Sequence, residues 1–329
     1  MLGSVLLRLL TVAGSVALTA CGGAPARDEL DPRGVATASR PVEAGTSDAC
    51  PSPLARVSEG REVGRVRSPM LTEVSGVVAS RAQPGLLWVH DDSGTGAILF
   101  AIDLEGHLLA QLTLEGAPAF DWEDIALEVV PGGPDRLWIA DVGDNAARDA
   151  SRDPRESVTI IRIEEPEIDP ARAPIVETRT QHDVFTLRYP DRPHDSEAIA
   201  IDPATGDLLL FAKENEAGSD VYRAAAPISD GADVVLEVIA QLGCGPMITA
   251  CDISPDGRAL LVRTYRSVLA WQRVEGEPWS QVLARPPRTM PARAEPQGES
   301  IAFLADGSAY LTISEGTDVP IWLFESDCE

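Results

Sequence analysis

The chain has 329 residues, a formal net charge of -25 at pH 7 and a sequence pI near 4.4. This acidic surplus excludes nucleic acid as a partner, because binding to a phosphate backbone requires a basic face. It favours cations as ligands, although solubility and self-repulsion at the protein surface account for most of such an excess.

Residues 1–20 have the composition of an export signal. One side-chain positive charge, Arg8, lies in a run of small and apolar residues that ends at Leu18-Thr19-Ala20-Cys21. The apolar core is too short to span a bilayer. Leu-Thr-Ala-Cys resembles the lipobox of bacterial lipoproteins, which implies that Cys21 is acylated and anchors the mature chain to a membrane. An unmodified Cys after an ordinary secretory signal is the alternative.

Residues 21–49 contain almost no large apolar side chain and cannot bury enough surface to fold. We expect them to form a flexible tether between the lipid anchor and a globular domain at 50–329. Gly22, in place of an Asp after the anchoring Cys, favours the outer over the inner membrane of the cell envelope by analogy with lipoproteins.

Four further cysteines predict two disulfides, because an exported chain matures in an oxidising compartment. Three connectivities are possible. We favour Cys50 with Cys328, which would join the two ends of the domain, and Cys244 with Cys251, which would close a short loop. A zinc site fits less well, since the chain has no Cys-x-x-Cys or His-rich spacing.

From residue 73 onward, short strands of alternating hydrophobicity are separated by Gly, Pro, Asp and Asn, without a long amphipathic helix. The clearest strands are 86–90, 97–103, 136–141, 158–163, 207–212, 259–264 and 309–314. The domain is therefore predicted to be all-β.

The strands also repeat. Five short segments each open a strand that is followed by a turn and a second strand, and three of the four intervals between them are about fifty residues. The longer interval contains an Asp- and Arg-rich insertion at about 145–156. This period predicts a β-propeller of five four-stranded blades, or six if residues 172–189 form another blade. The strand-like run at 54–66 is expected to supply the outer strand of the last blade and so to close the ring.

The five openings align into two columns of residues, two positions apart and therefore on one face of the strand. The earlier column contains Glu73, Asp121, Asp195, Thr249 and Gln297. The later column contains Ser75, Glu123, Glu197, Cys251 and Glu299. The first strand of each propeller blade lines a central channel, so these carboxylates are expected to converge near one axis. Accepting backbone hydrogen bonds from the neighbouring blade is the alternative role for each of them.

Carboxylates that lie close together cannot all ionise without compensation, and Ca²⁺ prefers sites rich in oxygen ligands. We therefore predict a calcium site in the channel. Its expected ligands are Asp121, Glu123, Asp141, Glu197 and Glu299. Lys213 and Arg263 lie at the ends of second strands and are the candidates to bind a small anionic ligand.

Three segments carry a family resemblance: Trp88-Val89-His90-Asp91-Asp92-Ser93-Gly94, Asp121-Trp122-Glu123-Asp124-Ile125-Ala126 and Asp141-Val142-Gly143-Asp144-Asn145. With these motifs the chain resembles the phytase-like β-propeller group of exported bacterial proteins. The resemblance implies several calcium ions in an acidic channel and hydrolysis of phosphomonoesters by metal-activated water. If the protein is an enzyme, it is then a metal-dependent phosphoester hydrolase. The alternative is a non-catalytic propeller that binds another envelope protein or polysaccharide; in both cases we expect a monomer.

Overall fold

The structure is a computed structural model of the chain, and it describes residues 54, 56–92, 94, 96–149, 152–214, 218–243 and 247–326. All of these belong to one compact unit, Ala49–Glu329. No helix within this described part is both long and apolar enough to cross a membrane. The expected signal segment, the tether and four cysteines lie outside the described residues: Cys21, Cys50, Cys244 and Cys328.

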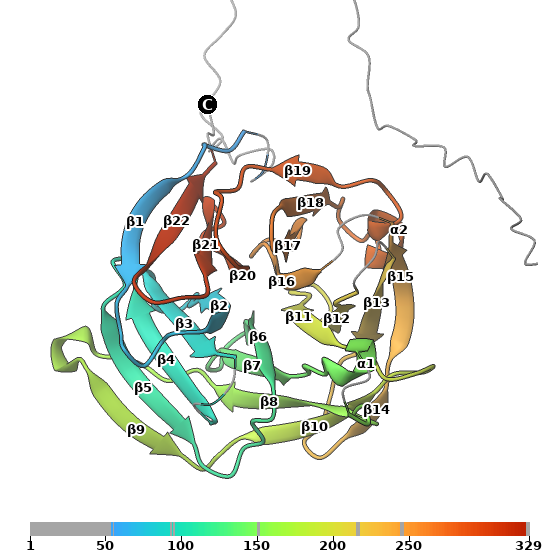
Figure 1. Cartoon of the computed structure of the whole chain (residues 1–329), viewed down its shortest axis with the longest axis horizontal. Coiled ribbons are helices and arrows are strands. Elements are labelled where there is room, and N and C mark those ends of the chain that lie inside the picture. Colours follow the sequence, from blue (N-terminus) through green and yellow to red (C-terminus); the bar gives the residue numbers. More distant parts are fainter. Residues whose placement is uncertain are drawn as a thin grey trace, which may run out of the picture. The chain divides into compact units, whose positions relative to one another are not determined.

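Five small sheets surround a central axis, so the domain is a five-bladed β-propeller (Figure 1). The inner strands of blades 1 to 5 are, in this order, β2 (Val74–Ala79), β6 (Trp122–Glu128), β11 (Ser196–Ile201), β16 (Ile248–Ile253) and β20 (Gly298–Phe303). The second strands are β3 (Leu86–Asp91), β7 (Arg136–Asp141), β12 (Leu208–Ala212), β17 (Ala259–Thr264) and β21 (Ala309–Ser314). The third strands are β4 (Ile98–Asp103), β8 (Val158–Glu164), β13 (Ser219–Ala224), β18 (Val268–Gln272) and β22 (Val319–Glu325). The fourth strands are β5 (Leu108–Leu114), β10 (Asp183–Arg188), β15 (Glu237–Leu242), β19 (Arg288–Met290) and β1 (Arg61–Val66).

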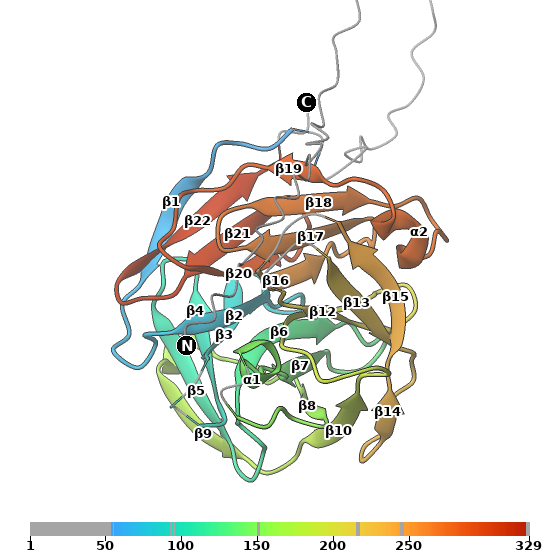
Figure 2. The same ribbon diagram turned by 45° about the vertical axis from the view of Figure 1, so that its right-hand side comes forward.

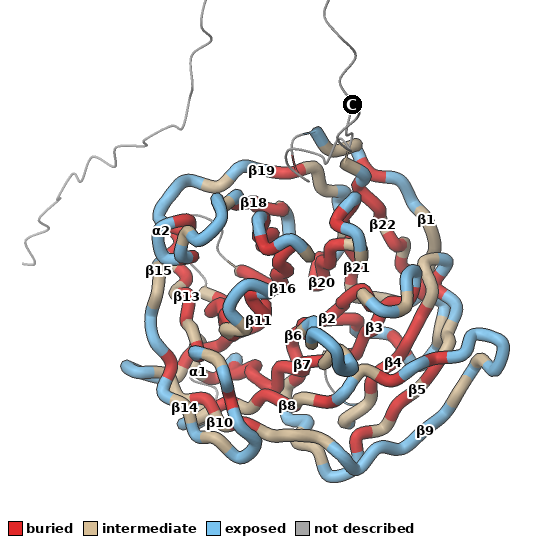
Figure 3. Tube along the Cα trace, turned by 180° about the vertical axis from the view of Figure 1, so that it is seen from behind, coloured by how far each residue is buried: buried red, intermediate tan, exposed pale blue. Residues whose placement is uncertain are grey.

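The hydrophobic core lies between the blades. Each inner strand contacts the inner strand of the next blade all the way around the ring. Apolar side chains form five clusters, one at each interface between adjacent blades. Trp88 and Trp138, for example, are buried in the clusters that join blade 1 to blade 2 and blade 2 to blade 3. Figure 3 shows the resulting gradient, with buried inner strands and largely exposed outer strands such as β9 and β15.

The ring closes through the N-terminal strand of the domain. β1 pairs antiparallel with β22, and Val66 lies opposite Val319 (Figure 2). A further isolated bridge joins Val57 to Ser326. Strands from both ends of the domain therefore share blade 5, which confirms the predicted role of residues 54–66.

Residues 172–189 do not form a sixth blade. β9 (Ile175–Arg179) pairs parallel with β5 as a fifth strand of blade 1, while β10 is the fourth strand of blade 2. In the same way, β14 (Asp233–Val235) pairs parallel with β10 as a fifth strand of blade 2. The remaining elements of the described chain are two short helices, α1 (Ala146–Asp149) and α2 (Trp279–Leu283), and a 3₁₀ turn, η1 (Pro170–Arg172).

Each inner strand begins with a β-bulge at the same position. The pairing register with the second strand skips one residue there, and the skipped residues are Ser75, Glu123, Glu197, Thr249 and Glu299. Thr249 therefore occupies the position that the sequence alignment assigned to Cys251. That alignment was wrong by two residues in blade 4. Because side chains alternate along a strand, a slip of two leaves the face unchanged and gives no signal in the sequence pattern.

Cys251 is a free cysteine, so the predicted Cys244–Cys251 disulfide is wrong. The corrected register places Cys251 at the position that Ile125 and Ile199 occupy in blades 2 and 3. Its side chain is only 2% exposed and packs in the hydrophobic cluster between blades 3 and 4. The thiol is thus a core side chain.

Candidate metal centre

The carboxylates of interest gather at the starts of the inner strands. Inner and second strands run antiparallel, so the first residues of one lie beside the last residues of the other; Trp122 lies opposite Asp141 and Ser196 opposite Ala212. The bulges at Glu123 and Glu197 fall at this end of the ring. A bulge re-aims a side chain, and here it does so beside the propeller axis.

Two groups of three carboxylates meet at this point. One oxygen each from Asp92, Asp121 and Glu123 lie within 4.8 Å of one another, and the same holds for Glu123, Asp195 and Glu197. Glu123 belongs to both groups. Carboxylate oxygens form the hard ligand set that Ca²⁺ and Mg²⁺ prefer. With Glu299, we call these residues the axial carboxylate cluster: Asp92, Asp121, Glu123, Asp195, Glu197 and Glu299.

Two features of the cluster fit a bound cation. Within the described part of the chain, one buried oxygen of Glu299 (Oε2) and one of Asp92 (Oδ1) accept no hydrogen bond. In addition, Gly143 leaves the space that the carboxylates occupy: a Cβ added there would lie 2.0 Å from Glu123 Oε1 and 2.5 Å from Asp121 Oδ2. Uncompensated buried oxygens are costly, and a cation is one way to satisfy them.

Burial and mutual repulsion oppose ionisation of these carboxyl groups. Burial raises the pKa of Glu299 to about 7, and burial together with the negative charge of Asp121 raises the pKa of Asp92 to about 7. The pKa of Glu123 is raised well above its usual range, first by burial and then by the charge of Glu197. Without a cation the cluster therefore holds protons near neutral pH, and a metal ion would displace them.

Two cations contact the cluster directly. Lys213 Nζ lies 2.5 Å from Glu197 Oε2 and 4.9 Å from the centre of the Tyr265 ring. Burial lowers the pKa of Lys213, but the adjacent Glu197 and the surrounding acceptors raise it by more, so the ammonium stays charged. Arg148 Nε lies 2.5 Å from Asp195 Oδ2. Among the described residues, six carboxyl groups thus face two directly paired cations, so acidic groups outnumber basic ones in the cluster.

The Arg-rich insertion supplies basic residues that sequence reasoning missed. Arg148 in α1 pairs with Asp195, Arg152 with Asp144 at 2.7 Å, and Arg155 with Asp141 at 3.2 Å. Both Arg152 and Arg155 also lie 4.9 Å from the ring of the exposed Phe120. The signal was the insertion itself, whose Arg and Asp residues have no counterpart in the other three intervals.

The structure brings together most, but not all, of the predicted site residues. Asp121, Glu123 and Glu197 lie in the two carboxylate groups, joined by Asp92 and Asp195. Asp141 lies outside these groups: its Oδ1 accepts hydrogen bonds from the backbone amide of Asp121 and from Arg155. A structural role, as acceptor for the Asp121 amide and for Arg155, therefore fits Asp141 better than metal ligation.

Arg263, predicted to bind an anion, forms an ion pair with Glu295, and the exposed fractions of the two side chains are 2% and 1%. Its guanidinium packs against Gly298, where an added Cβ would clash with it. Two guanidinium nitrogens and one oxygen of Glu295 have no hydrogen-bond partner among the described residues. The guanidinium of Arg263 thus has its ion-pair partner inside the protein, in Glu295.

Other polar residues near the axis join the blades to one another. Ser75 donates a hydrogen bond to the backbone oxygen of Glu123, and Thr249 donates one to that of Gly298. The Oδ2 atom of the buried Asp124 accepts from the backbone amides of Ile199, at 2.9 Å, and Cys251, at 3.4 Å. These three residues therefore join blades by hydrogen bonds; Ser75 and Thr249 donate to backbone oxygens, and only Asp124 accepts from backbone amides.

The raised pKa values predict how stability depends on pH. Asp92 and Glu299 bind protons more tightly in the folded than in the unfolded chain, so the free energy of unfolding in chelator should fall as pH rises from about 5 to about 8. Burial raises the pKa of Asp202, but the hydrogen bonds from Arg273 and the Ala204 amide together lower it by more, so Asp202 titrates below this window. Thermal unfolding across the range, compared with a Glu299→Gln variant, measures the effect. The prediction is contradicted if the wild-type midpoint does not fall more steeply with rising pH than the midpoint of the variant does.

A search with protein-family models finds no match to this chain, and a search of curated proteins finds none either.

Proposed function

We propose that the axial carboxylate cluster binds divalent cations, calcium in particular. The observation that carries this proposal is the sharing of Glu123 by two three-carboxylate groups, with buried oxygens of Glu299 and Asp92 left without partners. Oxygen ligands alone, from residues on four different blades and their connections, suit the flexible, high coordination number of Ca²⁺.

The basic residues around the cluster suit an anionic ligand. Lys213 and Arg148 pair with the cluster residues Glu197 and Asp195, while Arg152 and Arg155 pair with Asp144 and Asp141, which follow the Asp121 blade's second strand or end it. An anion held between a cation site and these side chains would form charge-assisted hydrogen bonds, which are the stronger kind. Such an arrangement supports a phosphate group as the ligand class.

Metal-dependent hydrolysis of phosphoesters is the enzymatic form of this proposal. A bound divalent ion would supply Lewis-acid polarisation of a phosphoryl oxygen and acidification of water. The chain would supply the rest: Glu123 and Glu197 would hold the ion, Lys213 would stabilise negative charge that develops on the phosphoryl oxygens, and Arg148 would orient Asp195 through their ion pair. We further propose that the protein works at the cell envelope, anchored through Cys21.

Thermal unfolding of the purified protein with calcium, magnesium or chelator tests the proposal. Calcium at a hundred times its dissociation constant should stabilise the fold by about 2.7 kcal/mol, which corresponds to a rise in Tm of roughly 5 °C. A Glu123→Gln, Glu197→Gln variant should fold but lose the response, because the ligand shared by both groups, Glu123, and its neighbour Glu197 lose their charge.

Glu177→Gln is the matched control, since Glu177 lies on the exposed outer strand β9. This variant should respond to calcium like the wild type. If neither calcium nor magnesium shifts the wild-type Tm, the metal proposal fails, and the propeller should then be treated as a binding scaffold. If the double variant keeps the full response, the ion binds elsewhere.

A further inference from the structure

The outer edge of blade 3 differs from the outer edges of blades 1 and 2. β5 and β10 each carry an added parallel strand, β9 and β14, supplied by the connection between the third and fourth strands of the following blade. β15 occupies the equivalent place in blade 3, but among the described strands it pairs only with β13. An unpaired edge offers main-chain N–H and C=O groups to another strand.

The reason lies in the connection that follows β18. In blade 4 this segment forms α2 instead of a strand, and Trp279, Val282 and Leu283 pack in the cluster between blades 3 and 4. The indole Nε1 of Trp279 donates a hydrogen bond to Asp202, and the Arg273 guanidinium lies 4.3 Å from the Trp279 ring. The connection is therefore fixed against blade 3 without adding a strand to it.

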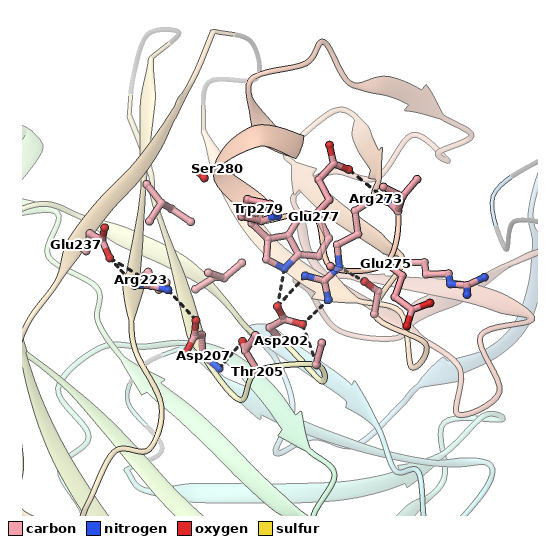
Figure 4. A pocket seen from close by; sticks show the side chains of 18 of the residues that line it. Asp202, Thr205, Asp207, Arg223, Glu237, Arg273, Glu275, Glu277, Trp279 and Ser280 are labelled. Atoms are coloured by element: carbon pink, nitrogen blue, oxygen red, sulfur yellow. Dashed lines mark hydrogen bonds and ion pairs between the residues drawn. The ribbon is translucent and has the colours of Figure 1, made fainter.

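A cleft of about 720 Å³ lies beside the first half of β15, which we call the β15 cleft (Figure 4). Glu237, Val238 and Ile239 all line it. Because alternate side chains of a strand point to opposite faces, three consecutive lining residues place the edge of the strand at the cleft. Val238 and Val274, also lining residues, are 48% and 70% exposed and offer apolar contact.

The β15 cleft is acidic. Three guanidiniums line it, of which Arg223 is paired with Asp207 and Glu237 and Arg273 with Asp202 (Figure 4). Six carboxylates line it: Asp202, Asp207, Glu237, Asp256, Glu275 and Glu277. The excess of negative charge favours a basic ligand. A second copy of this chain, with a net charge of -25, is poorly matched to such a surface.

We propose that the β15 cleft binds an extended, basic segment of a partner protein, which adds to blade 3 as a strand parallel to β15. β14 and β9 set the direction and a length of three to five residues, because they fill the equivalent positions of the other two blades. Alternate side chains of the segment contact Val238 and Val274 or the carboxylates. Strand addition of this kind draws affinity from the main chain and specificity from the side chains.

This site is separate from the axial carboxylate cluster. Asp195 and Glu197 lie at the start of β11, whereas Asp202, which lines the β15 cleft, follows its last residue. Peptide binding therefore does not depend on the proposed function, and chelator should leave it unchanged.

Selection from a random heptapeptide library displayed on phage, with the full chain immobilised in chelator, tests the proposal. Recovered peptides should be rich in Lys, Arg and β-branched residues. A synthetic peptide of recovered sequence should bind the double variant Glu237→Lys, Glu275→Lys at least about tenfold more weakly than it binds the wild type. The single variant Glu275→Lys should show a loss of the same size. It should also slow hydrogen exchange of the backbone amides of residues 237–240.

Glu62→Lys, Glu177→Lys is the matched control, because it makes the same charge change on outer strands of other blades; its affinity should equal that of the wild type. The proposal is overturned if no peptide is recovered, if the cleft variants bind it normally, or if exchange at 237–240 is unaffected. Concentration-dependent dimers of the wild type that the cleft variants abolish would assign the cleft to a second copy and overturn the partner assignment.

Discussion

Replacing Arg263 by Met should lower the free energy of unfolding by about 3 to 5 kcal/mol, since it leaves the Glu295 carboxylate buried without its cation. Both side chains are almost completely buried, so water cannot replace the lost partner. Urea denaturation of the purified variant measures the change. We expect a much lower midpoint with an unchanged slope.

The double variant Arg263→Met, Glu295→Leu is the control. Removing both charges should restore most of the lost stability, because a buried ion pair contributes little relative to apolar side chains of similar size. It also keeps the experiment informative if the single variant does not fold. A single variant as stable as the wild type would show that Arg263 is not committed to Glu295 and is available to a ligand.

Gly143→Ala should weaken calcium binding by roughly 10- to 100-fold, although it removes no proposed ligand and no charge. The added Cβ would overlap the positions of Glu123 Oε1 and Asp121 Oδ2, so both carboxylates must move. The φ angle of Gly143 lies outside the left-handed region, and the backbone itself therefore tolerates Ala. Isothermal calorimetry with calcium measures the loss of affinity.

Gly133→Ala is the matched control, because a Cβ at Gly133 meets only one methyl group of Val130, at 3.2 Å. Its calcium affinity should equal that of the wild type. If Gly143→Ala binds calcium as tightly as Gly133→Ala does, the ion is not held by the Glu123 and Asp121 carboxylates in the arrangement described here.

Much of the fold could be predicted from the sequence repeat. Period and turn signals predicted the blades, and the isolated strand before the first repeat predicted the closure of the ring by β1, because every sheet must pair its edges or leave them exposed. Blade number stayed open at the sequence level, since nothing local distinguishes β9, which joins the preceding blade, from the first strand of a new one.

The candidate site could be predicted only where one position recurs in several blades. Glu123, Glu197 and Glu299 share the bulge position, so the repeat places them together. In blade 4 the alignment slipped to Cys251, because a shift of two residues preserves the alternation of side chains. Arg148 could not be assigned a role from the repeat, because the connection that carries it has no counterpart in the other blades.

A crystal structure of the protein grown with calcium, with anomalous scattering data, tests the central claim most directly. We expect an anomalous peak at about 2.3 to 2.6 Å from a carboxylate oxygen of Glu123, with further ligands from Glu197 or from Asp121. A fully occupied calcium peak remote from Glu123, or none at saturating calcium, would contradict the assignment of the axial carboxylate cluster as a metal centre.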